Sequence, residues 1–508
     1  METIRLIGRG SPLSLLQIEK VKRRIESVCP GIKTKIIVAG SRGDALQDMP
    51  LHTVEGSDFF TEEIFEKLVT PEADIAVHSL KDMSSEHFFG NNLFAVMERE
   101  DARDVALFNR KVLEKIKRGE SLVIGTCSPR RDEMATGFLQ KALPQLNDQF
   151  KVTTQFIRGN VDTRLKKLDR GEYDGIILAT AGLNRLLGSG TGAGEIKKLL
   201  KDKLLMILPL IECVPAPCQG AIVAEAHASN KKAVGILNKI NDKSLLADCY
   251  AEKKEAIKYG AGCIQRFGVT TLDTKNGKFL YAAGKDSEGT EFVKWNSLPD
   301  IKFNKDRLFS STEVMKDFFD YKWNEDTIVI DKPVVFIANY KSIRQKSEAG
   351  FLANKTIFAS GTKTWFALSK KGFWVQGCAD AMGFEFLLPS LQMPLLNIHV
   401  GDIAILTHDV AAERWRKKGY NAVSNYKLLP KNNESIRQSI ANAGSIFWSS
   451  YAQYEFYGKY AMPDVQHLCA GGETAELLKE AGAGPVVFPT IKSFQQWRNS
   501  SFRSHSVA

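Results

Sequence analysis

Short apolar runs alternate with longer amphipathic stretches through about the first 226 residues of this 508-residue chain. The runs at 4–7, 75–77, 122–124 and 175–179 are each followed by polar or charged residues. This alternation predicts α/β lobes built on mainly parallel sheets. In open sheets of this kind, ligands collect beyond the carboxyl ends of the strands. We therefore expect the polar residues after these runs to form a binding site.

Five polar clusters occupy such positions. In chain order they are 9–13 (RGSPL), 78–82 (HSLKD), 125–131 (GTCSPRR), 157–165 (IRGNVDTRL) and 181–185 (AGLNR). Cys263 lies further on, in the glycine-rich segment 259–264 (YGAGCI). A thiol where the backbone turns freely is a candidate covalent attachment point, although an isolated Gly-Cys pair is more often a buried structural cysteine.

These clusters, in this order and ahead of a cysteine, resemble the hydroxymethylbilane synthase family, also called porphobilinogen deaminase. The resemblance covers about residues 4–268, and the segments 98–104 (EREDARD), 168–174 (LDRGEYD) and 215–221 (PAPCQGA) also fit it. It implies a transferase of porphyrin and heme biosynthesis that joins four porphobilinogen molecules into hydroxymethylbilane with loss of ammonia. It also implies two type II periplasmic-binding-protein-like lobes and a small α+β cofactor domain.

The resemblance gives roles to individual residues. Asp82 would be the catalytic carboxylate, and Cys263 would carry a dipyrromethane cofactor in a thioether bond. Cofactor contacts are expected from Lys81, Asp82, Ser128, Arg130 and Arg131, and substrate contacts from Arg9, Ser11, Arg158, Arg164 and Arg185. Arginine suits this task because its planar fork binds a carboxylate bidentately and stays charged. For any single arginine a solvated surface role competes, and Asp82 alone would fit a helix cap or a partner of Lys81.

Two positions depart from the family pattern. Ser57 and Asp58 stand where Lys-Gly is usual, so the loop around them would carry a different charge balance. Arg266 stands where a proline is common, which leaves the turn after Cys263 less constrained.

We expect lobe one at 1–100 together with 204–226, lobe two at 101–203, the third domain at 227–325, and a further module at 326–508. The last module carries a weak internal repeat, in which 334–339 (VVFIAN) is echoed by 445–450 (SIFWSS). Likewise 357–368 is echoed by 468–478, each as a strand, a glycine turn, a threonine near a helix start and an amphipathic helix. Duplicated α/β half-domains follow from this repeat.

The repeat resembles uroporphyrinogen-III synthase, a two-lobed α/β enzyme, and 485–489 (PVVFP) sits where that family has a late strand. The family's usual opening strand is not visible before Val334. The resemblance implies a bifunctional enzyme whose lyase-type C-terminal module cyclises hydroxymethylbilane to uroporphyrinogen III, with Thr364, Tyr426 and Thr474 in its ligand cleft. The alternative is a deaminase with an inactive C-terminal module.

Composition narrows the remaining possibilities. The net charge is +10, but Lys and Arg are spread along the chain without a basic run or a nucleic-acid-binding signature. Eight cysteines without a Cys-x-x-Cys pair support neither a zinc site nor a disulfide framework. With no apolar signal core or membrane-length window, we expect a cytoplasmic enzyme without metal, nucleic-acid or membrane partners. A two-lobed anion-binding protein or sensor without catalysis is the competing class.

Overall fold

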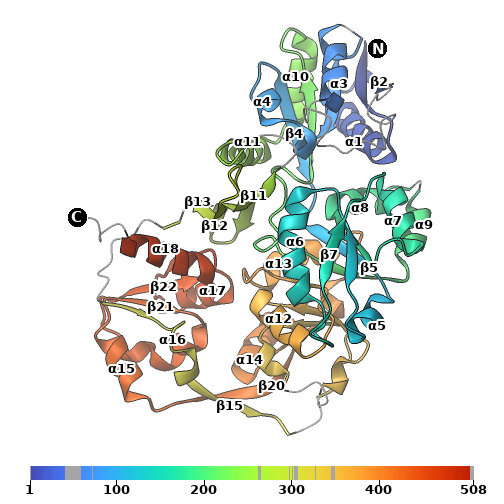
Figure 1. The fold of residues 1–508 in the computed structure, drawn as a ribbon. Helices are drawn as coiled ribbons and strands as arrows, with labels where there is room; N and C mark the ends of the chain where they lie inside the picture. The colour runs from blue at the N-terminus through green and yellow to red at the C-terminus, as the bar shows by residue number, and fades with distance from the viewer. Residues whose placement is uncertain are drawn as a thin grey trace.

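The computed structural model describes residues 2–39, 59–70, 72–190, 192–260, 265–296, 298–299, 301, 307–325, 328–344 and 349–503. Cys263, Ser57 and Asp58 lie outside the described residues. Five β-sheets organise the described part of the chain (Figure 1). No helix in that part combines the length and apolar character needed to cross a membrane.

Lobe one is a five-stranded sheet in the order β2-β1-β3-β10-β4. Its strands are β1 Glu2–Arg9, β2 Ile32–Ala39, β3 Ile75–Ser79, β4 Leu93–Arg99 and β10 Ala221–Ala226, and its helices are α1 Pro12–Val28, α3 Phe59–Val69, α4 Ser85–Phe88 and α10 Lys231–Ile240. β1 runs parallel to β2 and β3, whereas β10 returns antiparallel between β3 and β4. The apolar face of α10 packs in one core with α1, so α10 belongs to lobe one and not to the third domain.

Lobe two is a second five-stranded sheet, in the order β7-β6-β8-β5-β9. Its strands are β5 Asp104–Asn109, β6 Leu122–Gly125, β7 Val152–Gln155, β8 Gly175–Ala179 and β9 Lys203–Ile207, and its helices are α5 Val112–Lys117, α6 Pro129–Ala142, α7 Val161–Asp169, α8 Thr180–Leu187 and α9 Ala193–Leu200. β9 pairs antiparallel with β5. The expected return to lobe one at 204 is therefore too early, because the chain completes β9 first.

The third domain packs helix α11 Lys243–Ile257 against an antiparallel sheet of β11 Arg266–Thr274, β12 Gly277–Lys285 and β13 Glu291–Asn296. This is the small α+β unit that we expected, but its limits of 227–325 need correction at both ends. α10 belongs to lobe one, and the two short strands after β13 pair with strands near the end of the chain.

The C-terminal module, residues 307–503, contains two further sheets. The six-stranded sheet has the order β15-β20-β19-β16-β17-β18 and the four-stranded sheet has the order β14-β21-β22-β23. Their strands are β14 Leu308–Ser310, β15 Phe319–Trp323, β16 Val334–Ile337, β17 Thr356–Ala359, β18 Gly377–Cys378, β19 Ile403–His408, β20 Asn421–Pro430, β21 Ser445–Trp448, β22 Gln466–Ala470 and β23 Val486–Phe488. β14 is an opening strand parallel to β21, located before the expected boundary at 326.

The helices of the module follow the predicted repeat. They are α12 Thr362–Lys370, α13 Phe384–Gln392, α14 Asp409–Lys417, α15 Glu434–Ala441, α16 Tyr451–Tyr457, α17 Glu473–Glu480 and α18 Ile491–Arg503. β17 leads through Gly361 into α12, and β22 leads through Gly471 and Gly472 into α17. The strand, glycine turn and helix expected twice are therefore both present.

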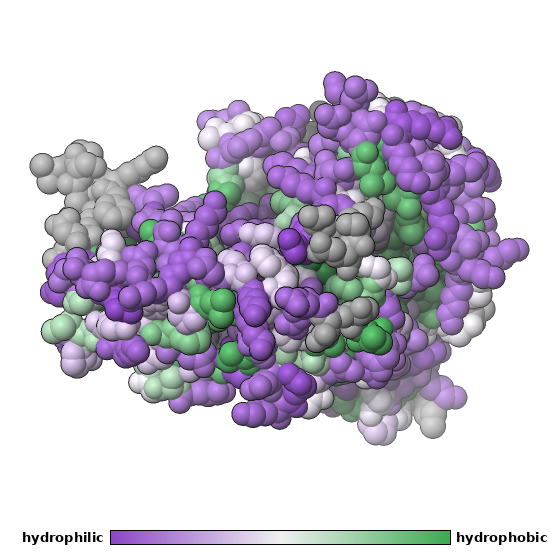
Figure 2. Space-filling view, turned by 90° about the horizontal axis from the view of Figure 1, so that it is seen from below, coloured by the Kyte–Doolittle hydropathy of each residue, from purple (hydrophilic) through white to green (hydrophobic). Residues whose placement is uncertain are grey.

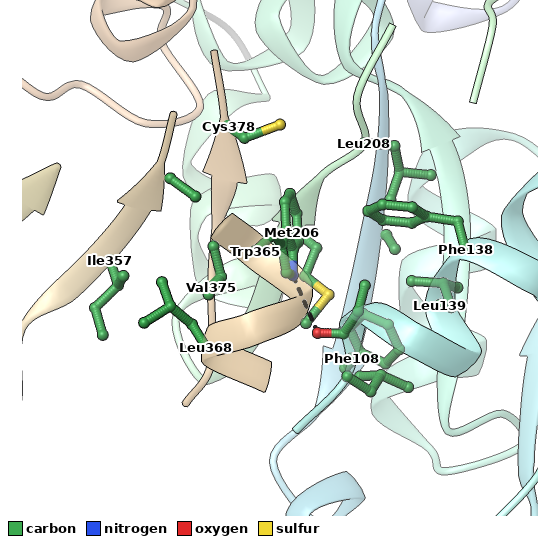
Figure 3. Packing of buried hydrophobic residues seen from close by; sticks show 14 of the residues in the cluster. Phe108, Phe138, Leu139, Met206, Leu208, Ile357, Trp365, Leu368, Val375 and Cys378 are labelled. Atoms are coloured by element: carbon green, nitrogen blue, oxygen red, sulfur yellow. Dashed lines mark hydrogen bonds between the residues drawn. The ribbon is translucent and has the colours of Figure 1, made fainter. Parts of the chain in front are cut away.

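One buried cluster joins lobe two to the C-terminal module. It combines Phe108 and Phe138 of lobe two with Trp365 and Leu368 of α12 (Figure 3). The face of the molecule seen in Figure 2 is mostly hydrophilic, with hydrophobic side chains in scattered spots. The apolar residues of this junction contribute to the contact between lobe two and the C-terminal module.

Candidate functional site

The first turn of α6 presents two neighbouring arginines to one buried carboxylate. Arg130 Nη2 and Arg131 Nη2 each lie 2.8 Å from an oxygen of Asp104, at the start of β5. Burial alone would raise the pKa of Asp104, but the two guanidinium charges hold it well below its usual range. Two cations share one anion, so these three side chains together carry one positive charge.

Asp82 of lobe one lies near this cluster. It ends the 3-10 helix Leu80–Asp82 after β3, and its side chain is 65% exposed. Burial lowers the pKa of Arg131, but attraction to Asp104, with smaller contributions from Cys127 and Asp82, raises it overall. Asp82 is therefore an accessible carboxylate within electrostatic reach of a cation on the opposite lobe.

The competing structural roles for Asp82 are weak in this geometry. The neighbouring helix α4 is capped by Ser84, whose side chain accepts a hydrogen bond from the His87 backbone N–H. The Lys81 ammonium lies 3.8 Å from Asp82 and both side chains reach solvent, so the pair contributes little to stability. Asp82 and Lys81 are free to turn toward a ligand.

Ser11 and Ser128 both cap helices. The Ser11 hydroxyl accepts from the Ser14 N–H at 3.3 Å at the start of α1, and Ser128 accepts from the Arg131 N–H at 3.5 Å at the start of α6. In each cap the oxygen is the acceptor, so the hydroxyl proton stays available. Either serine can therefore cap its helix and donate to a bound anion at once.

Arg185 lies in α8 at the connection between the lobes. Its Nη2 donates to the Gly220 carbonyl, and its Nε lies 3.8 Å from Glu98 Oε1. Burial lowers the pKa of Arg185 more than the charges of Glu100 and Glu98 raise it. Its Nε and the Nε of Arg131 are buried without a hydrogen-bond partner among the described residues. Such orphaned donors are costly unless a ligand uses them.

The remaining predicted arginines lie at strand and helix ends. Arg9 is the last residue of β1. Arg158 follows β7 and stacks over Phe156 at 5.5 Å, and Arg164 in α7 donates from Nε to the Gly159 carbonyl at 2.7 Å. Phe156, half exposed beside Arg158, is an aromatic surface that the sequence analysis missed.

The segments 9–13 of lobe one and 181–185 of lobe two approach each other closely at Gly182. A Cβ added at Gly182 in α8 would lie 3.5 Å from the Leu13 side chain in α1. Figure 1 shows α8 of lobe two next to α1 of lobe one. The segments carrying Arg9, Ser11 and Arg185 therefore meet at one place between the lobes.

Three supporting residues escaped the sequence analysis. Asp104 holds the arginine pair, and Gln219 Nε2 donates to Asp104 at 2.9 Å. The Glu252 carboxylate of α11 accepts hydrogen bonds from both Nη atoms of Arg99, which connects the third domain to the end of β4. Asp104 and Gln219 lie in segments that resemble the family, but a sequence motif does not indicate which residues its side chains contact.

The C-terminal module has a second cationic region, where the carboxyl ends of its two sheets face each other. Lys363 of α12 lies 3.9 Å from the sulfur of Met315, which follows β14, and Arg414 of α14 stacks over Tyr451 of α16 at 5.3 Å. Lys341, after β16, donates to the Tyr321 hydroxyl and lies 3.6 Å from the Tyr321 ring centroid. Among the described residues, neither Lys341 nor Lys363 pairs with a carboxylate.

The three threonine and tyrosine positions predicted for this module belong to three different elements. Thr364 is buried in α12 with its hydroxyl 3.1 Å from that of Ser360, and Tyr426 is buried in β20 beside His408 and Tyr321. Thr474 is half-buried in the first turn of α17. No hydrogen bond or ring contact within the described chain joins these three residues.

A cavity of about 610 Å³ lies where lobe two, the third domain and both sheets of the module meet. Its lining includes Arg103, Lys275, Glu385 and Glu473, and acidic side chains outnumber basic ones by seven to three. This charge balance suits the carboxylates of a pyrrole substrate poorly. The cationic clusters described above are better candidates.

Comparisons with known proteins match mainly the first half of the chain. Residues 4–234 match the family model described as porphobilinogen deaminase, dipyromethane cofactor binding domain. A probable porphobilinogen deaminase of Pyrobaculum islandicum is 34% identical over 291 residues, covering 57% of this chain and 89% of the relative. A porphobilinogen deaminase of Thiobacillus denitrificans is 36% identical over 281 residues, covering 55% and 84%.

Similarity to solved structures is weaker. An arginine-specific periplasmic binding protein of Salmonella typhimurium is 11% identical, covers 50% of this chain and 99% of its own, and gives a TM-score of 0.27. YhfZ of Shigella flexneri, also 11% identical, covers 51% and 98% with a TM-score of 0.24. Scores this low support no fold assignment. The sequence comparisons are sufficient by themselves, and they show that the chain belongs to the porphobilinogen deaminase family.

Proposed function

We propose that lobes one and two with the third domain condense four porphobilinogen molecules into hydroxymethylbilane, with loss of ammonia, in tetrapyrrole biosynthesis. The observation that carries the proposal is an exposed carboxylate, Asp82, within reach of a buried arginine pair that keeps one positive charge. Porphobilinogen supplies an amine to protonate and carboxylates to bind, and this arrangement meets both needs.

Asp82 has the chemistry that the deamination requires. Its carboxyl group can donate a proton to the leaving amine and, once ionised, stabilise the positive charge that develops on the ring-bound methylene carbon. Arg185 would contact a substrate carboxylate, since its Nε has no hydrogen-bond partner among the described residues. Asp82 is exposed to solvent, so an enclosed pocket does not position the substrate amine. Substrate carboxylates held by the arginines would instead orient the amine toward Asp82.

The same region fits the dipyrromethane cofactor named by the family model. Such a group carries carboxylates, and orphaned buried donors with a net positive charge match them. Lys81, Ser128 and Arg131 would contact it, with Arg130 acting through Asp104, and Cys263 would provide the thioether. When bound, the group supplies a primer to which the growing chain stays tethered.

The test is porphobilinogen turnover by the purified full-length chain, read as ammonia release and bilane formation together with the intact mass. We expect both products and a covalent dipyrrole adduct. An unmodified chain that binds carboxylates without releasing ammonia would support the anion-binding or sensor alternative.

We further propose that the C-terminal module cyclises hydroxymethylbilane to uroporphyrinogen III. The supporting observation is the pair Lys341 and Lys363, which lie without carboxylate partners among the described residues where the carboxyl ends of the module's two sheets face each other. The half-buried Tyr321 adds an aromatic ring beside Lys341. A linear tetrapyrrole offers several carboxylates and pyrrole rings, so cations beside aromatic rings could fold it for closure.

The test for this second activity uses the full chain. We expect the wild-type protein to form mainly the III isomer from porphobilinogen, and a Lys341→Met/Lys363→Met variant to shift the product toward the I isomer that forms spontaneously. If the wild-type protein itself gives the spontaneous mixture, the module is inactive and only the deaminase activity stands. Truncation near Asp331 is a poor test, because it leaves β14 and β15 behind without their partner strands.

A further inference from the structure

Helix α6 links the proposed deaminase site to the C-terminal module. Its first turn holds Arg130 and Arg131, and its last turn carries Phe138, Leu139 and Ala142 into a cluster with α12. The rings of Phe138 and Trp365 meet edge to face with centroids 5.1 Å apart (Figure 3). An isolated lobe two would expose this apolar face to water.

The module also satisfies the end of α6. The last carbonyl groups of a helix have no partner within the helix. The carbonyl of Ala142, the last residue of α6, accepts from Trp365 Nε1 at 3.0 Å and from Ser369 Oγ at 2.7 Å. The Gln145 N–H then donates to the Ser369 carbonyl at 2.8 Å. Side chains of α12 therefore cap the helix that carries the arginine pair.

Two further contacts hold the same units together. The module covers the edge strand β9, because the Ile207 N–H donates to the Gln376 carbonyl at 2.7 Å and Trp374 Nε1 donates to the Leu205 carbonyl at 3.0 Å. Arg103 Nη2 lies 3.0 Å from Asp380 Oδ2, with both side chains almost fully buried. Arg103 directly precedes Asp104, the carboxylate that holds the arginine pair.

We infer that the α6 and β9 face of lobe two is an interaction surface whose partner is the half of this chain's own C-terminal module built on the six-stranded sheet, and that lobe two and this half fold as one unit. The module then maintains the deaminase site through α6, whether or not it cyclises the product. The buried cluster beneath α1 and α10 of lobe one contains only residues of that lobe. Lobe two, and not lobe one, should therefore depend on the module.

The experiment compares two tryptophans in the full-length protein. Trp365 and Trp448 are both fully buried, but Trp448 of β21 lies in a cluster whose described members all belong to the C-terminal module. We expect Trp365→Ala to lower the temperature of deaminase inactivation by on the order of 10 °C. Amide hydrogen exchange in α6 should also become faster. Trp448→Ala should change neither the inactivation temperature nor exchange in α6.

A milder variant covers the case in which Trp365→Ala cannot be purified. Ser369→Ala removes one donor to the Ala142 carbonyl, and we expect faster exchange in the last turn of α6 with the same bilane rate at low temperature. Equal effects of the two tryptophan variants on α6, or unchanged exchange in Ser369→Ala, would overturn the inference. Exchange is measured without substrate, so the result stands apart from whether the proposed reactions occur.

Discussion

Asp82 and Arg131 belong to different lobes, yet the charge of Asp82 contributes to the raised pKa of Arg131. An exposed carboxylate thus lies within electrostatic range of a buried cation whose Nε has no hydrogen-bond partner within the described chain. A pyrrole group held between the two would have its carboxylate at Arg131 and its ring near Asp82. This relationship leads to the first prediction.

Asp82→Asn should fold and keep its covalent adduct or part of it, but lose most turnover. An amide can neither protonate the leaving amine nor offset the cation's charge, and losing such a contact commonly lowers the rate by about 10² to 10³. Single-turnover ammonia release and intact mass measure the two properties separately. Near-normal bilane formation by the purified variant would rule out the role.

Asp104→Asn should destabilise lobe two. Removing the charge leaves two buried guanidinium groups without an anion, and breaking a buried pair in this way typically costs about 3 to 5 kcal/mol. Urea unfolding followed by circular dichroism measures the change. Asp148→Asn, at an exposed position between α6 and β7, is the control, and equal loss in both variants would contradict a special role for Asp104.

The buried position of Glu225 beside two histidines predicts that acid lowers the stability of lobe one. Its side chain is fully buried and lies 2.7 Å from His87 and 3.3 Å from His78. Burial would raise the pKa of Glu225, but these two partners lower it to about 2. A depressed carboxyl pKa stabilises the fold above the unfolded pKa, by about 3 kcal/mol here, and this stabilisation disappears as the pH falls through the folded pKa.

The free energy of unfolding should accordingly decrease as the pH falls from about 4.5 toward 2. Glu225→Gln should show a flatter dependence over that window, and the exposed Glu288→Gln should behave as wild type. Parallel pH curves for all three proteins would show that Glu225 contributes nothing to acid sensitivity.

The position of Lys341 leads us to expect that the proposed cyclisation step depends on pH. Burial, with a smaller contribution from the Lys363 charge, lowers the pKa of Lys341 to about 8. Its ammonium is lost as the pH rises through that value, so a bound carboxylate loses its partner. The fraction of III isomer should therefore fall between pH 7 and 9, whereas Lys341→Arg should hold it constant. An isomer ratio independent of pH in the wild type would argue against carboxylate binding by Lys341.

The sequence was most informative where structure is local. Short apolar runs before polar clusters predicted β3, β6 and β8 and the residues at their ends, because a strand and the turn after it are adjacent in the chain. The internal repeat predicted α12 and α17 for the same reason. The assignment of roles to Asp82 and Cys263 came from family resemblance and remains a prediction.

Contacts between distant segments could not be predicted. The pairing of Arg130 with Asp104 spans 26 residues and depends on how β5 and α6 pack. β14 has three residues, which are too few to show an alternation of apolar and polar positions. The sequence therefore predicts a start for the C-terminal module that is too late in the chain. The apolar face of α12 indicated burial, but nothing local identified α6 as its partner.

The most direct measurement is peptide mapping of the purified full-length protein by mass spectrometry. The central claim predicts an adduct of two linked pyrrole units on Cys263, absent from Cys263→Ser. The competing thiols differ in access, because Cys218 is fully buried, which raises its pKa well above the usual range, whereas Cys127 is half-buried near Arg131. An adduct on Cys127 or Cys218, or an unmodified chain that still forms bilane at full rate, would contradict the account.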